Sequence, residues 1–97
     1  MAILVDDAVW PFRGERWAHL VSDASYEELH VFVGMLGVPH RAFQGDHYDL
    51  PERLRPAALA LGAQAVSSRE LVRRLRAAGL RLDRTHRAAR AEPATES

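Results

Sequence analysis

The sequence predicts a small α/β domain in which three short strands alternate with three helices. Short apolar runs recur along the chain. In addition, a serine or an aspartate is three times followed, three positions later, by a glutamate, which is the capping-box pattern of a helix N-terminus. Strands that alternate with helices are joined by right-handed crossovers and pair in parallel. We therefore expect a Rossmann-like βαβαβα unit of two or three layers, built on a short parallel sheet of three strands.

The first strand is expected at residues 2–5, the all-apolar run AILV, which ends at the acidic pair Asp6 and Asp7. Such a short run, interrupted so soon by charge, fits a buried strand and neither a signal peptide nor a membrane span, so the expected location is the cytoplasm. The next segment, DDAVWPFRGERWAHLVSD, holds both tryptophans together with Pro11 and Gly14. We expect a long loop there, of the kind that usually carries function in a small domain.

The helices follow from the capping boxes and from the glycines that end each apolar period. We expect them at about residues 26–36, 51–62 and 69–78. Their capping boxes are the pairs Ser25 and Glu28, Asp49 and Glu52, and Ser67 and Glu70. An internal proline costs about 3 kcal/mol in a regular helix, so Pro56 is expected to split the second helix into a short first turn and a second start.

The remaining strands are expected between the helices, at residues 38–43 and 63–66, and residues 80–83 are a candidate for a fourth strand. From about Arg84 onward the apolar residues show no period. We therefore expect one α/β domain over residues 1–83 and a disordered C-terminal tail over residues 84–97.

Composition limits the chemistry. The chain has no cysteine, so disulfides, thiolate nucleophiles and cysteine-bound zinc are excluded, and a metal would need histidine and carboxylate ligands. Residues 1–50 carry three arginines against eight acidic residues, whereas residues 51–97 carry ten against five, so the charge is polarised although the net charge is zero. The arginine-rich segment that begins at Arg69 fits either a solvated helix face or a nucleic-acid surface.

In open parallel α/β sheets, ligands bind beyond the carboxyl ends of the strands. This rule selects Asp6 and Asp7 after the first strand, residues 40–49 after the second, and residues 67–69 after the third. The loop that carries both tryptophans emerges at the same edge, so its polar residues can reach the same place. We therefore expect one site at this edge of the sheet.

The stretch FQGDHYDLP suggests metal chemistry, because aspartate oxygens and histidine nitrogens suit divalent ions such as manganese, iron, zinc or magnesium. Asp6, Asp46 and His47 are the predicted ligands of a divalent metal ion, with His19 as a further member. Two structural interpretations stay open. Asp49 has a sufficient role as the cap of the second helix, and His47 and Tyr48 also fit a packed loop.

A second kind of site is predicted at the start of the third helix. Backbone N–H groups and the helix dipole favour an anion beside Ser67, Ser68 and Arg69. Arg69 opposes the dipole, which is acceptable on a solvated surface and useful if it holds a phosphate or carboxylate. His30, beside the apolar stripe of the first helix, is interpreted as a half-buried structural histidine. Trp17 either covers the core or stacks on a base or on a partner's side chain.

Three stretches, WAHLVSD, FQGDHYDLP and AVSSRELVRRLRAAGLR, together resemble a family of small bacterial and phage domains, domain-of-unknown-function family 4031, from Ile3 to about Arg81. The matching positions are Trp17, His19, Leu20, Ser22, Asp23, Glu28, Leu29, His30, Asp46, His47, Tyr48, Asp49, Gly62, Ala63, Ser67, Ser68, Arg69 and Glu70. The resemblance implies one shared site for five of these residues, which are His19, Asp46, His47, Ser68 and Arg69. It implies no activity.

Two functions of different classes remain. The first is a metal-dependent phosphoester hydrolase or nuclease-like enzyme, with His19, Asp46 and His47 as catalytic residues and a divalent ion bound by the predicted metal ligands. The second is a non-catalytic module that binds a nucleotide, a nucleic acid or a protein. Its predicted binding residues are Ser67, Ser68, Arg69, Tyr48 and Trp17. No membrane partner is expected, and the sequence leaves the oligomeric state and enzymatic activity open.

Overall fold

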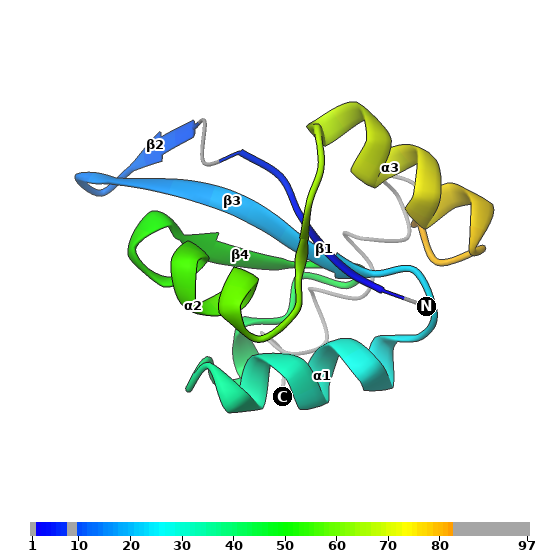
Figure 1. Cartoon of the computed structure of the whole chain (residues 1–97), viewed down its shortest axis with the longest axis horizontal. Helices are drawn as coiled ribbons and strands as arrows, with labels where there is room; N and C mark the ends of the chain where they lie inside the picture. Colours follow the sequence, from blue (N-terminus) through cyan, green and yellow to red (C-terminus); the bar gives the residue numbers. More distant parts are fainter. Residues whose placement is uncertain (1, 8–9, 83–97) are drawn as a thin grey trace, which may run out of the picture.

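The computed structural model describes residues 2–7 and 10–82, which form a mixed α/β domain with a five-stranded sheet (Figure 1). The strands are β1 (Ile3–Val5), β2 (Trp10–Phe12), β3 (Glu15–Ser22), β4 (Tyr48–Pro51) and β5 (Gln64–Ala65). The α-helices are α1 (Tyr26–Met35), α2 (Arg55–Ala60) and α3 (Ser68–Ala77), and the 3-10 helices are η1 (His40–Ala42) and η2 (Glu52–Leu54).

The longest strand, β3, organises the sheet. One of its edges pairs with β2 near its start and with β1 near its end, and its other edge pairs with β4, all antiparallel. β5 pairs with the outer edge of β1, and this is the only parallel pairing among the described strands. The predicted three-stranded parallel sheet is therefore wrong.

The segment predicted as a long loop is instead the β2–β3 hairpin. Arg13 and Gly14 form its two-residue turn, with φ of +54° and +77°, the left-handed pair that a tight hairpin requires. Along β3 the residues alternate between the two faces of the sheet, as the pleat demands. Ala18 and Leu20 are buried on one face, while His19 between them is half-buried on the other. Because His19 and the charged residues at its start interrupt its apolar residues, β3 lacks the continuous apolar run on which the strand prediction relied.

The strand predicted at residues 38–43 is also wrong, because this stretch holds the short η1 turn after Pro39. The strand lies farther along, at β4, where its register with β3 buries Tyr48 and Leu50. Asp49 between them is a strand residue, so the prediction that it caps the following helix is wrong. Gly45, with φ of +96°, turns the chain into β4.

The helices follow the predicted local signals at α1 and α3. The hydroxyl oxygen of Ser25 accepts a hydrogen bond from the Glu28 backbone N–H, and Ser67 caps α3 through Glu70 in the same way. The split of the second helix is confirmed, since η2 precedes α2 and a proline lies in the first turn of α2.

The candidate fourth strand is absent at residues 80–82, and Asp83 lies outside the described residues, as does the tail over residues 84–97. The predicted domain boundary near residue 83 therefore stays a prediction. Across the described part of the chain, no helix combines the length and the apolar character that crossing a membrane requires.

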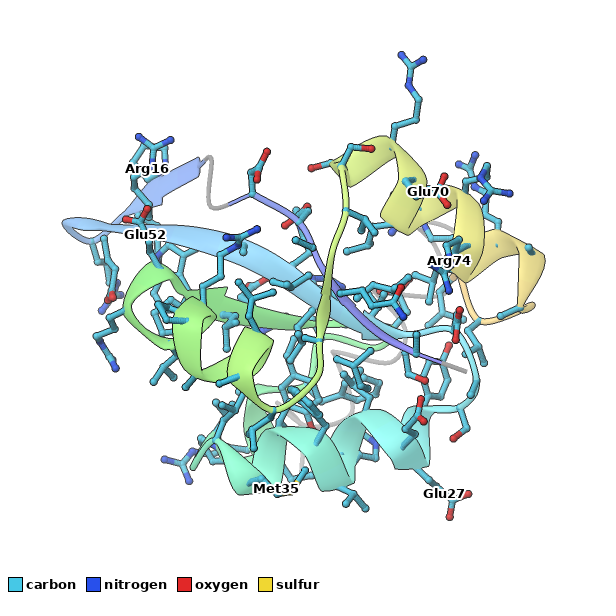
Figure 2. The ribbon with its side chains drawn as sticks, viewed as in Figure 1. Arg16, Glu27, Met35, Glu52, Glu70 and Arg74 are labelled. Carbon is cyan, nitrogen blue, oxygen red and sulfur yellow. The ribbon has the colours of Figure 1, made fainter. Side chains whose placement is uncertain are left out.

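The sheet separates two layers of helix (Figure 1). On one face, α1 and α2 pack over the main core around Leu20, Leu29 and Tyr48. On the other face, α3 covers a smaller cluster that includes Leu4 and Leu71. Figure 2 shows Met35 of α1 and Glu70 of α3 on opposite sides of the sheet. Because α3 covers one end of its face, polar side chains elsewhere on that face border a pocket.

Candidate functional site

A pocket of about 240 Å³ lies between α3 and the face of the sheet beneath it. Its polar lining comes from Asp6, His19, His47, Ser68 and Arg81. Its apolar lining comes from Val21, Leu71, Val72 and Leu75. Residues from both ends of the described chain thus meet around one small cavity.

The first half of the site is an aspartate–histidine pair. Asp6 directly follows β1, where the chain leaves the sheet, and its side chain is fully buried. One carboxylate oxygen accepts the backbone N–H of His19 at 2.6 Å, and the other lies 2.7 Å from His19 Nδ1. The Ser68 hydroxyl donates to this second oxygen at 2.7 Å. Asp6 therefore ties β1, β3 and the start of α3 together and orients the His19 ring.

The second half repeats the arrangement. Asp46 is fully buried in the turn before β4, and one carboxylate oxygen lies 2.7 Å from His47 Nδ1. The other oxygen accepts the Leu82 backbone N–H at 3.0 Å and lies 3.6 Å from an Arg81 guanidinium nitrogen. On the other side of the same ring, His47 Nε2 lies 3.2 Å from an Asp49 oxygen. Asp46 thus orients His47 as Asp6 orients His19.

The two halves meet across β3 and β4. His19 and Asp49 are paired residues in the antiparallel register, so their side chains project from the same face of the sheet. The rings of His19 and His47 are 5.3 Å apart between centroids. Each of His19, His47 and Asp49 offers one ligand atom, and these three atoms all lie within 4.8 Å of one another. Within residues 2–7 and 10–82, these three side chains form the group compatible with a metal ion.

The electrostatics of the site favour ion pairs. Burial alone would raise the pKa of Asp6, but hydrogen bonds from His19 and Ser68 outweigh it and hold this pKa below its usual value. Burial would likewise raise the pKa of Asp46, but the hydrogen bonds from His47 and from the Leu82 backbone N–H outweigh it and hold this pKa below its usual value. For His47, burial lowers the pKa, yet the carboxylates of Asp46 and Asp49 prevail and raise it to about 9. Without a metal, His47 is therefore an imidazolium at neutral pH.

The residues predicted from the sequence separate into three groups. Asp6, His19, Asp46, His47 and Ser68 come together at this site, whereas Arg69, which was predicted to share it, does not. Trp17 lines a neighbouring pocket that shares Asp49 with the site.

The other predicted residues lie elsewhere. Tyr48 is buried in the main core, where its hydroxyl lies 2.8 Å from His30 Nδ1. His30 is half-buried, as predicted. Ser67 caps α3, and Arg69 is exposed and lines a separate groove along that helix.

The DUF4031 family model, described as a protein of unknown function, matches residues 3–78. The chain belongs to the DUF4031 family. This confirms the resemblance stated from the sequence, and the DUF4031 match spans both aspartate–histidine pairs and Asp49. No curated protein and no solved structure matches this DUF4031 chain.

Two residues of the DUF4031 site were missed by sequence reasoning. Asp49 was assigned to a helix cap, although the alternation of Tyr48, Asp49 and Leu50 is the signal of a strand with one polar face. Arg81 follows the end of α3 and reaches the pocket only because the chain turns back beneath that helix at Gly79, whose φ is +77°. No local sequence signal identifies such a return.

Proposed function

We propose that His19, His47 and Asp49 bind a divalent metal ion and that the protein is a metal-dependent phosphoester hydrolase. The observation that carries this proposal is the convergence of the three ligand atoms within 4.8 Å, with a buried aspartate behind each histidine. Ligand atoms about 2.1 Å from a tetrahedral zinc lie about 3.4 Å from one another. A small inward movement of the three side chains therefore completes the site.

The buried aspartates suit such a site. A histidine that binds a metal commonly donates its other ring N–H to a carboxylate, which fixes the tautomer and orients the ring. Asp6 and Asp46 stand in this position, each at an Nδ1 atom, so that Nε2 is the ligand atom of His19 and of His47. The sequence predicted Asp6 and Asp46 as metal ligands. In the proposed site these two aspartates instead orient the histidine ligands, and Asp49 is the carboxylate ligand.

Three protein ligands leave a coordination position for water, as in catalytic zinc and manganese sites. A divalent ion held by His19, His47 and Asp49 would lower the pKa of a bound water and would polarise a phosphoryl oxygen. In the hydrolysis that this chemistry would support, the water oxygen would bond to phosphorus as the bond to the leaving oxygen breaks, and the proton released from the water would end on the leaving alcohol. A phosphoester is favoured because Arg81 and the N-terminus of α3 at Ser68 place positive potential beside the ligands.

The experiment is calorimetric titration of the metal-free protein with Mn²⁺ and Zn²⁺, followed by assays with bis(p-nitrophenyl) phosphate. We expect one bound ion per chain and hydrolysis that depends on the ion. Asp49→Asn and His47→Gln should reduce both. Asp7→Asn is the matched control, because Asp7 neighbours Asp6 in the chain but has a side chain that is 76% exposed. Binding of neither ion, or binding that both site variants leave unchanged, contradicts the proposal.

A non-catalytic binding module is the second candidate, and the apolar wall of the pocket favours it. Val21, Leu71 and Val72 line the cavity beside the polar atoms, an arrangement that suits an organic ligand carrying an anionic group. In this case a phosphate compound raises the melting temperature of the protein, and no hydrolysis accompanies binding.

A further inference from the structure

A second cavity adjoins the proposed metal site and shares Asp49 with it. This cavity has a volume of about 230 Å³. It is lined by Phe12, Trp17, Ala42, Gln44 and Asp49. Trp17 lies two residues before His19 in the regular strand β3, so the two side chains project from the same face about 7 Å apart along the strand. A ligand held at the metal therefore extends directly toward the two aromatic rings.

The aromatic wall is held in place by its own contacts. Trp17 Nε1 donates a hydrogen bond to the Phe12 backbone oxygen at 3.0 Å, which fixes the indole against the neighbouring strand. Phe12 is 55% exposed although it is large and apolar. The Arg13 guanidinium lies 5.3 Å from the centre of the Phe12 ring, so a cation accompanies the aromatic surface.

One polar side chain completes this wall. The Gln44 amide is exposed at the rim, and the hydrogen bond that it donates to the Ala42 backbone oxygen is long at 3.4 Å. A side-chain amide can donate and accept at the same time, as the edge of a nucleobase also does. Gln44 can therefore exchange its weak internal contact for one with a base.

We propose that this aromatic pocket, formed by Phe12, Trp17 and Gln44, binds a nucleobase whose attached phosphate lies at the metal site. The proposal rests on the proposed function and names its substrate class, a nucleotide unit. Aromatic rings stack on any base and, next to positively charged groups, form the usual surface for unpaired nucleotides. Asp49 lines this aromatic pocket and also belongs to the proposed ligand group, so a base in the pocket lies next to a phosphate at the metal.

A nucleotide unit can come from a mononucleotide or from a single strand of nucleic acid. A groove lined by Ser68, Arg69, Val72, Arg73 and Arg76 runs along α3 and shares Ser68 and Val72 with the metal-site pocket. Arg69 and Arg76 are seven residues apart in one helix, a rise of about 10 Å, which is the length of about three stacked nucleotides. This groove favours the single strand as the source.

The test compares ligands that differ only in their bases. Dissociation constants are measured by calorimetry with Mn²⁺-loaded protein for adenosine 5′-monophosphate against ribose 5-phosphate. The same measurement compares a ten-nucleotide phosphorothioate strand with its abasic counterpart. We expect the base to strengthen binding by about 5- to 150-fold in at least one pair. Preference in the first pair alone identifies a mononucleotide, and preference in the second identifies a strand. Equal affinities within both pairs overturn the proposal.

Variants locate the effect. Trp17→Leu should abolish the preference for the base while leaving Mn²⁺ binding unchanged, and Trp17→Phe should retain part of the preference. Phe12→Ala, at an exposed position that tolerates truncation, should weaken the preference without unfolding the hairpin. Met35→Ala is the matched control, since Met35 is 60% exposed, close to the value for Phe12, but lies on α1, across the sheet (Figure 2). A preference that survives both Trp17→Leu and Phe12→Ala contradicts the assignment of this pocket.

The two proposals fail in different ways. Metal-dependent hydrolysis of bis(p-nitrophenyl) phosphate without any preference for a base retains the proposed function and overturns the base pocket. A base preference that depends on Trp17 in a protein that binds no Mn²⁺ or Zn²⁺ supports the base pocket and overturns the proposed function.

Discussion

His19 and Asp49 face each other across the antiparallel pair formed by β3 and β4, and their side chains project from the same face of the sheet. The sheet register therefore brings together a nitrogen ligand and an oxygen ligand that are thirty positions apart in the chain. His47, at the entry to β4, adds the third. Since the cavity beside them also contains Arg81, the pairing of these two strands is what links the fold to the proposed chemistry.

The buried aspartates give the first prediction. Asp6→Asn and Asp46→Asn leave all three proposed ligands in place but remove the negative charge behind each histidine. Replacing such a partner typically weakens metal affinity by about 10- to 100-fold. Titration calorimetry with Zn²⁺ measures the effect, and circular dichroism verifies that the variants are folded. Affinity within twofold of the parent protein for both variants would argue against the orienting role.

The protonation of His47 gives the second prediction. In metal-free protein, nuclear magnetic resonance should show His47 titrating with a pKa of about 9, and His30 titrating below its usual 6.5 because of burial and the neighbouring His40. Asp46→Asn should lower the His47 pKa, since it removes the closer carboxylate. A His47 that titrates below His30 contradicts the geometry around this ring.

The same shift affects stability in a defined pH range. The folded pKa of His47, about 9, lies above the unfolded value of 6.5, so its stabilising contribution is complete below pH 6.5 and is lost as the pH rises to 9. This difference between the folded and unfolded pKa values corresponds to a contribution of His47 to the free energy of unfolding on the order of 3 kcal/mol. Urea denaturation of the metal-free protein between pH 6 and pH 10 measures it. In His47→Gln the decrease over this range should be absent.

Whether a feature of the fold could be predicted from the sequence depends on how far apart along the chain the residues that determine it lie. The caps at Ser25 and Ser67 are local hydrogen bonds within three residues of their partners, and both were predicted correctly. The pairing of β3 with three other strands is a long-range property that no local period reveals. Because β3 was predicted as a loop, its antiparallel pairings were missed, and the sheet was predicted as parallel although it is largely antiparallel.

The site shows the same division. Asp6, His19, Asp46, His47, Ser68 and Arg69 were predicted to share a site from the rule that ligands bind beyond the ends of strands and from the family resemblance. All of them except Arg69 come together. Their roles could not be predicted, since the role depends on which atoms face each other. The capping-box pattern locally favours Asp49 as a helix cap. The burial of Tyr48 and Leu50 in the core outweighs this local preference and keeps Asp49 in a strand.

Arg81 gives the third prediction. Arg81→Gln removes a cation from the pocket, so the affinity of the metal-loaded protein for inorganic phosphate should fall by about tenfold or more, as expected when a charged hydrogen bond is lost. Calorimetry with phosphate measures the change. Arg41→Gln, at an exposed position in η1, is the control and should have no effect. Equal affinity in the Arg81 and Arg41 variants would exclude Arg81 from anion binding.

Tyr48 gives the fourth prediction. Tyr48→Phe removes the hydroxyl that lies 2.8 Å from His30 Nδ1, so the free energy of unfolding should fall by about 1 kcal/mol. Because Tyr48 lies in the main core, Mn²⁺ affinity should not change. Urea denaturation and titration calorimetry on the same variant separate the two effects. A large loss of Mn²⁺ affinity without a loss of stability would place the Tyr48 hydroxyl at the metal site instead.

The most direct test of the central claim is X-ray diffraction from crystals soaked in Zn²⁺ or Mn²⁺, with data collected at the absorption edge of the metal. We expect one anomalous peak per chain, about 2.0–2.2 Å from His19 Nε2, His47 Nε2 and an Asp49 oxygen. Asp6 and Asp46 should remain on the Nδ1 atoms of the two rings. An anomalous peak elsewhere, or no peak in a protein saturated with either ion, would contradict a metal site formed by His19, His47 and Asp49.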